Sequence, residues 1–147
     1  MSVRPKLLFV CRGAEAHLSF MHYLERAGCR LIVAREAEHA AKILVTAVDV
    51  DAILIHHEDI TLGSTMGSGF KLITPLLPVL LLTKEWPTNG VLPGGVDALC
   101  YAVSLNRRVA NDIARFVRYL LLEQPLSPLD DMQEAGRFIP HKPNYLN

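Results

Sequence analysis

The sequence predicts an α/β protein with five parallel strands covered by helices on both faces. Amphipathic segments with helical spacing lie between several short apolar runs, and this alternation favours parallel strands joined by right-handed crossovers. The apolar runs are bounded by polar residues, the pattern of strands that are buried on both sides. They are residues 7–10, 31–34, 52–55, 79–82 and 98–102.

Length and composition indicate one folded domain. Half of the 147 residues are hydrophobic and a fifth are charged, and the fifteen basic residues equal the fifteen acidic ones. A neutral total charge gives no field to attract nucleic acid or an acidic membrane surface, so we expect neither as a direct partner. The longest apolar stretch is too short to cross a bilayer and no export signal opens the chain. Three cysteines indicate free thiols, so we expect a cytoplasmic protein.

The first two crossovers carry clear helical patterns. Apolar residues recur at helical spacing over residues 14–27, and Gly28 supplies a stop after them. Residues 37–45 have an alanine-rich apolar stripe, which allows a second helix to lie close to the sheet.

The next two crossovers are interrupted by glycine and proline. Residues 60–78 carry three glycines and two prolines, which leaves room only for a short helix over residues 69–74. Residues 84–94 hold two prolines and two glycines, and proline removes a backbone donor and clashes with the preceding turn. The fourth helix is therefore predicted to be reduced to a loop.

The last helix is predicted over residues 109–121, with Ser104 as its N-cap and Pro125 as its end. We divide the chain into a main domain, residues 1–124, and a C-terminal tail, residues 125–147. The tail has the signals of one short helix: Ser127 as cap, Pro128 at the first helical position and Gly136 as stop.

Polar residues at the strand ends are the candidate site, because chemistry in open α/β sheets collects at the carboxyl ends of the strands. A flavodoxin-like strand order of 2-1-3-4-5 places the end of the first strand beside the end of the third. The residues at these ends are Cys11, Arg12, His56, His57, Thr83, Lys84 and Ala102.

Three segments resemble the receiver domain of two-component response regulators. They are residues 51–56 (DAILIH), 78–83 (PVLLLT) and 95–99 (GVDAL), and the likeness extends over about residues 6–124. The resemblance implies a three-layer (βα)5 sandwich and a role in signal transduction.

The resemblance also implies a phosphorylation site, and its residues are changed here. In the family, an acidic pair after the first strand binds Mg²⁺ and an aspartate after the third accepts the phosphoryl group. A hydroxyl and a lysine follow the fourth and fifth strands. The matching positions are Cys11 and Arg12, His56, Thr83 and Ala102, so only the hydroxyl is kept. The family's aromatic switch position falls on Leu99, with Tyr101 two residues on. We therefore expect no Mg²⁺ and no aspartyl phosphate.

The changed pocket leaves alternatives open. His56 is a competent nucleophile, or it fills the aspartate's place and hydrogen-bonds to Thr83, which we favour. A metal site from residues 56–59 is disfavoured, because adjacent strand side chains point to opposite faces. The glycines of residues 63–69 suggest a phosphate cradle or, as we favour, a mobile loop. Arg12 would lower the pKa of Cys11, although a buried thiol is the commoner outcome.

We expect a phosphorylation-independent interaction module, not an enzyme, with no cofactor and no metal. Its partner, another protein or a second copy, would bind the loop of the fourth crossover, the fifth strand and the last helix. Trp86 either roofs the sheet or anchors this interface, and the arginines form either a contact stripe or a solvated face. An anion sensor at Arg12, His56, His57 and Thr83 is the alternative function, as are an adaptor phosphorylated at His56 and an enzyme that uses His56 or Cys11. The candidate contact residues are Trp86, Tyr101, Arg108, Arg115 and Arg118.

Overall fold

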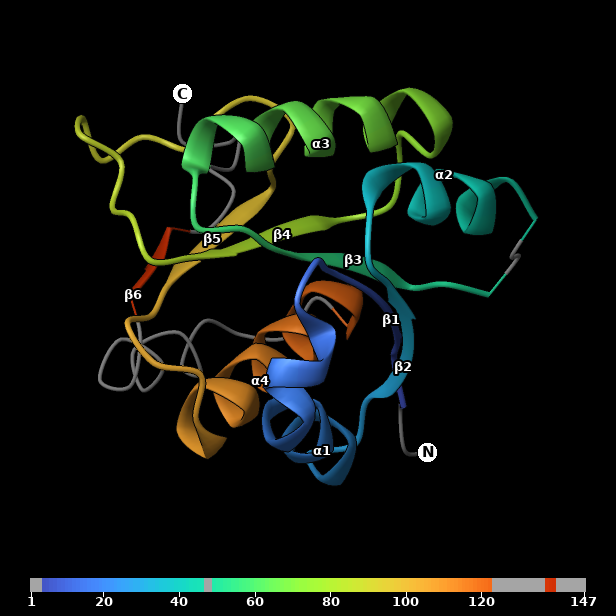
Figure 1. Ribbon diagram of the computed structural model, residues 1–147, viewed down its shortest axis with the longest axis vertical. Coiled ribbons are helices and arrows are strands. Elements are labelled where there is room, and N and C mark those ends of the chain that lie inside the picture. Colours follow the sequence, from blue (N-terminus) through green and yellow to red (C-terminus); the bar gives the residue numbers. More distant parts are fainter. Residues whose placement is uncertain (1–3, 47–48, 123–136, 140–147) are drawn as a thin grey trace.

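A computed structural model describes residues 4–46, 49–122 and 137–139. Its sheet contains five parallel strands in the order β2-β1-β3-β4-β5, as predicted (Figure 1). The strands are β1 (Lys6–Cys11), β2 (Arg30–Ala34), β3 (Ala52–His56), β4 (Val79–Thr83) and β5 (Ala98–Tyr101).

Helices cover both faces of the sheet, which gives the three layers expected from the sequence (Figure 1). The short 3₁₀ helix η1 (Ala14–His17), α1 (Leu18–Arg26) and α4 (Arg107–Leu122) lie on one face; α2 (Ala37–Thr46) and α3 (Ile60–Ile73) lie on the other. Gly28 follows α1 with a φ of 105°, a conformation that favours glycine, so the predicted stop is confirmed. In the described part of the chain, no helix has both the length and the apolar character needed to cross a membrane.

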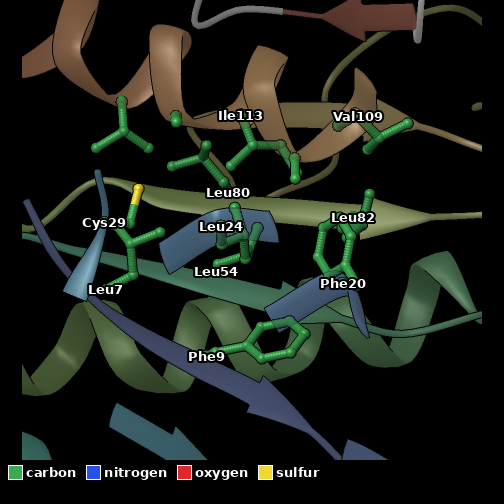
Figure 2. Packing of buried hydrophobic residues seen from close by; sticks show 14 of the residues in the cluster. Leu7, Phe9, Phe20, Leu24, Cys29, Leu54, Leu80, Leu82, Val109 and Ile113 are labelled. Carbon is green, nitrogen blue, oxygen red and sulfur yellow. The ribbon is translucent and has the colours of Figure 1, made fainter. Parts of the chain in front are cut away.

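Each face of the sheet has its own apolar core, because successive strand residues point to opposite sides. Leu7, Phe9 and Leu54 face α1 and α4, where they meet Phe20 and Ile113 (Figure 2). The residues between them in the strands belong to the second core, on the side of α2 and α3. The two cores fix which side of the sheet each strand-end side chain occupies.

The third crossover holds a full helix, so the prediction of a short helix over residues 69–74 is wrong. Asp59 caps α3 by accepting hydrogen bonds from the backbone N–H groups of Thr61 and Leu62, at 2.8 and 3.0 Å. Gly63 and Gly67 are contact points and not helix breakers. A side-chain carbon at Gly63 would lie 2.6 Å from Leu81, and one at Gly67 would overlap the carbonyl oxygen of Gly95.

Because residues 63–69 are helical, neither the mobile loop nor the phosphate cradle proposed for them exists. The fourth crossover, residues 84–97, contains no helix or strand, as predicted. The last helix begins at Arg107, and the side chain of Asn106 accepts a hydrogen bond from the Val109 N–H at 3.0 Å. Asn106 is therefore the N-cap, and the prediction of Ser104 is wrong, because the helix begins at Arg107, three residues after Ser104.

A sixth strand, β6 (Arg137–Ile139), pairs antiparallel with β5 and was not predicted. Its register sets Ile139 opposite Leu99 and Arg137 opposite Tyr101. An unpaired edge strand is a template for pairing with other chains, so β6 covers that edge of β5 with the chain's own tail. The short helix predicted between Ser127 and Gly136 lies outside the described residues.

Candidate functional site

The candidate site is a pocket at the carboxyl ends of β1 and β3. These strands are neighbours, and Cys11 is the register partner of His56. The chain then turns after β1 and forms η1, which ends at His17 beside the end of β3. The pocket has a volume of about 400 Å³ and is lined by Arg12, Gly13, His17, His56, His57 and Glu58.

Three potential ligand side chains meet at this pocket. The Sγ atom of Cys11 lies 3.4 Å from Nδ1 of His56. The rings of His17 and His56 meet edge to face, with centroids 4.8 Å apart and planes at 81°. One ligand atom from each of the three residues lies within 4.8 Å of the others. Cys11 is buried, and both histidines are partly exposed toward the pocket.

The surroundings favour the uncharged forms of Cys11 and His56 at neutral pH. Burial lowers the pKa of His56 from 6.5 to about 4, and the nearby His17 adds to the effect. Burial also raises the pKa of the Cys11 thiol, which outweighs the opposing effect of the Gly13 backbone N–H. The favoured interpretation of Cys11 as a buried thiol is therefore confirmed, and the alternative of a pKa lowered by Arg12 is wrong.

Thr83, the one matching residue of the implied phosphorylation site, has a structural role. Its buried hydroxyl donates a hydrogen bond to the carbonyl oxygen of Glu58 at 3.3 Å and accepts one from the Glu85 N–H at 3.2 Å. In place of the predicted hydrogen bond to His56, the bond to Glu58 joins the ends of β3 and β4, and the bond from Glu85 is local to the turn after β4. The backbone N–H of Ala102 donates to the Thr83 carbonyl at 3.0 Å, so the two positions are adjacent.

The polar run after β3 divides into separate contacts. His57 Nδ1 accepts a hydrogen bond from the Asp59 N–H at 3.0 Å, while the Asp59 carboxylate caps α3. Glu58 forms an exposed ion pair with Lys84 at 3.4 Å. These side chains turn toward different neighbours, and all three lie beyond the end of β3 at His56, so the path of the backbone after the strand separates them.

The donor set at the strand ends does not fit Mg²⁺. This ion takes about six oxygen ligands and is held in proteins by carboxylates. The positions of the implied acidic pair carry a thiol, Cys11, and a guanidinium, Arg12. Glu58 lines the pocket, but its carboxylate is paired with Lys84. The ligands that remain at the end of β1 and β3 are sulfur and imidazole nitrogen.

The five predicted contact residues fall into three groups. The Trp86 ring meets the Tyr101 ring edge to face at 5.9 Å and 86°, and 41% of the Trp86 side chain stays exposed. Arg108 and Arg115 are exposed on α4. The Arg118 guanidinium instead donates a hydrogen bond to the carbonyl of Ala27, so it ties α4 to the end of α1.

His17 is the site residue that the sequence interpretation missed. It lies in the turn after β1 and not at a strand end, so it was never compared with the strand-end residues. The signal that would have found it is a histidine six residues after Cys11, because this short segment must pass over the end of β1 before α1 begins.

Comparison with known proteins identifies the fold. No family model matches the chain, and no curated protein matches it. Among solved structures, a receiver domain from Methanospirillum hungatei is similar with a TM-score of 0.65 and 15% identity, covering 83% of this chain and 100% of that one. The chemotaxis response regulator CheY4 of Vibrio cholerae gives a TM-score of 0.64 and 17% identity, covering 78% and 99%.

A LuxR family DNA-binding response regulator from Silicibacter pomeroyi gives a TM-score of 0.62 and 22% identity, covering 77% of this chain and 90% of that one. These likenesses cover 77–83% of this chain, at identities of 15–22%. The chain therefore has the fold of response regulator receiver domains.

Proposed function

We propose that this chain is a phosphorylation-independent, receiver-like domain that acts as a protein-interaction module in cytoplasmic signal transduction. One observation carries the proposal: the fold is kept, while the positions that would bind Mg²⁺ and accept a phosphoryl group are Cys11, Arg12 and His56. Without a metal or lysine, the charge on a transferring phosphoryl group is not neutralised. The domain accordingly has no catalytic role.

The contact surface follows from the remodelled fourth crossover. Residues 84–97 form a loop, and Trp86 packs its ring edge to face with Tyr101 while a large part of it faces solvent. Aromatic side chains held in this way are frequent binding hot spots. Arg108 and Arg115 are exposed at the outer side of α4 and add positive charge. A protein partner, which includes a second copy of this chain, would bind Trp86, Tyr101 and these two arginines.

Incubation with acetyl phosphate and Mg²⁺ tests the proposal. We expect the intact mass and the amide chemical shifts of Cys11, His56 and Thr83 to stay unchanged, whereas a receiver domain that keeps its acidic residues gains a phosphoryl group under the same conditions. A stoichiometric mass gain that is lost in His56→Ala would contradict the proposal and favour phosphorylation of His56.

Anion sensing is the second candidate function, and the pocket favours it. Arg12, Gly13 and His57 line the pocket. The positive charge of Arg12 and nearby polar groups would favour the binding of a small anion there. Titration with inorganic phosphate, followed by the amide shifts of Arg12 and Gly13, tests it. Saturable shifts that disappear in Arg12→Gln support a sensor, and the absence of saturable shifts rules it out.

A further inference from the structure

We propose that Cys11, His17 and His56 form a binding site for a transition-metal ion, with Zn²⁺ as the expected ion. The inference departs from the sequence-based expectation of no metal, because it depends on His17, which the fold places beside the other two residues. It does not depend on the proposed contact surface, since neither Trp86 nor Tyr101 lines the pocket.

The distances suit one tetrahedral ion. Bond lengths of about 2.3 Å to sulfur and about 2.0–2.1 Å to nitrogen set ligand atoms in a tetrahedral site about 3.5 Å apart. The Sγ atom of Cys11 and Nδ1 of His56 already lie 3.4 Å apart. All three ligand atoms fall within 4.8 Å of one another, so a rotation of the His17 side chain would bring its ring nitrogen to the spacing of a tetrahedral site.

The fold holds two of the ligands firmly and leaves the third adjustable. Cys11 and His56 are register partners on neighbouring buried strands, so the sheet fixes their separation. His17 ends the short helix η1 and is partly exposed, so its side chain can turn without disturbing a core. Cys29 and Cys100, by contrast, are buried in the apolar core, and within the described part of the chain neither belongs to a cluster of three potential metal ligands.

The chemistry of the three ligands selects the metal. Thiolate and imidazole favour Zn²⁺ and related ions, whereas Mg²⁺ requires oxygen ligands. On binding, the Cys11 sulfur forms a bond to the metal as its proton leaves to solvent, and each histidine donates one nitrogen lone pair. No electron is transferred. Three protein ligands leave a fourth position open to the pocket, where water or a small anion near Arg12 would complete the site.

Metal titration of the full-length chain tests the site. Chelator-treated protein is titrated with Zn²⁺ in competition with a chromophoric chelator, and separately with Co²⁺ as a spectroscopic probe. We expect one ion per chain, with visible Co²⁺ bands of tetrahedral intensity and a near-ultraviolet thiolate-to-cobalt band. Cys11→Ala should remove the thiolate band, and His17→Ala and His56→Ala should each weaken Zn²⁺ binding at least about tenfold.

Matched variants separate this site from general binding by thiols and histidines. Cys29→Ala removes another buried thiol, and His22→Ala removes an exposed histidine of α1; both should bind Zn²⁺ as the original chain does. Circular dichroism checks that each variant is folded, and the partly exposed His17→Ala decides the question if Cys11→Ala fails to fold. No stoichiometric binding, or binding unchanged in His17→Ala, overturns the proposal and leaves the acetyl phosphate test unaffected.

Discussion

The two ends of the sheet differ in the charge of the side chains that meet there. Near the start of β4 and β5, Asp97 forms a partly buried ion pair with Lys71 and accepts a hydrogen bond from the Val79 N–H at 2.8 Å. Lys71 also donates to the carbonyl of Leu77 at 2.9 Å. At the other end of the sheet, Cys11 and His56 meet as neutral groups with raised and lowered pKa values.

The contrast explains how the fold persists without the implied phosphorylation site. The Asp97 carboxylate satisfies a backbone donor where β4 begins, so its removal would disturb the sheet itself. The carboxylates that the resemblance implies at the carboxyl ends would have faced a solvent-filled pocket and held a metal. Their replacement by Cys11, Arg12 and His56 changes the chemistry of the pocket and leaves the sheet's hydrogen bonds in place. Four predictions test this division, beginning with the largest effect.

Asp97→Ala should lower the free energy of unfolding by about 2–4 kcal/mol, because it leaves the Lys71 ammonium and the Val79 N–H without their partner. Urea denaturation measures the change. Glu58→Ala is the matched control at the other end of the sheet, since it breaks the exposed pair with Lys84 and should cost less than about 1 kcal/mol. Equal losses in the two variants would contradict the comparison.

Gly67→Ala should cost about 1–3 kcal/mol, because its side chain would overlap the backbone of Gly95 where α3 meets the fourth-crossover loop. Gly69→Ala, in the same helix but facing open space, should instead raise stability by up to about 1 kcal/mol. Thermal or urea unfolding compares the pair. A neutral Gly67→Ala would mean that this close contact does not position α3.

The pocket end of the sheet should give a pH dependence that depends on His56. Its pKa falls from 6.5 to about 4 on folding, so the unfolded chain binds a proton more readily than the folded one. Stability should be full above pH 6.5 and fall as the pH decreases toward 4, by about 1–2 kcal/mol once solvent screening is allowed for. Urea unfolding in the presence of a chelator measures the decrease, and His56→Gln should reduce it. An equal decrease in the free energy of unfolding in His56→Gln would show that another group causes the pH dependence.

Substitutions on the proposed contact surface should have the smallest effect on stability. Arg108→Ala should change the free energy of unfolding by less than about 0.5 kcal/mol, because its side chain is exposed. Arg118→Ala should cost more, because it removes the hydrogen bond that joins α4 to Ala27. Differential scanning calorimetry compares the two variants; a larger loss in Arg108→Ala would place that residue in the scaffold.

Sequence patterns predicted the features that are encoded locally. Each parallel strand is a continuous apolar run, and its place in the sheet follows from the alternation with helices. The extent of α3 was missed because Gly63 and Gly67 have low helix propensity, and only the close approach of Leu81 and Gly95 explains their presence. β6 was missed because three residues in the tail give no periodicity.

The candidate site shows the same limit. The predicted strand order was enough to predict that Cys11 and Arg12 lie close to His56. The register of β1 and β3, in which Cys11 is opposite His56, confirms this proximity. The position of His17 depends on how the chain turns through η1, which no apolar pattern specifies. Likewise, the partners of Thr83 depend on the backbone path after β3 and β4, so its bond to Glu58 was not predictable.

Loss of the Mg²⁺ and phosphoryl site is the claim on which this account depends. Its most direct measurement is a titration of the isotope-labelled chain with Mg²⁺ and beryllium fluoride, a mimic of an acyl phosphate, followed by amide chemical shifts. The account predicts no saturable change at Cys11, Arg12, His56 or Thr83. Saturable shifts at those four amides, dependent on both reagents, would contradict it.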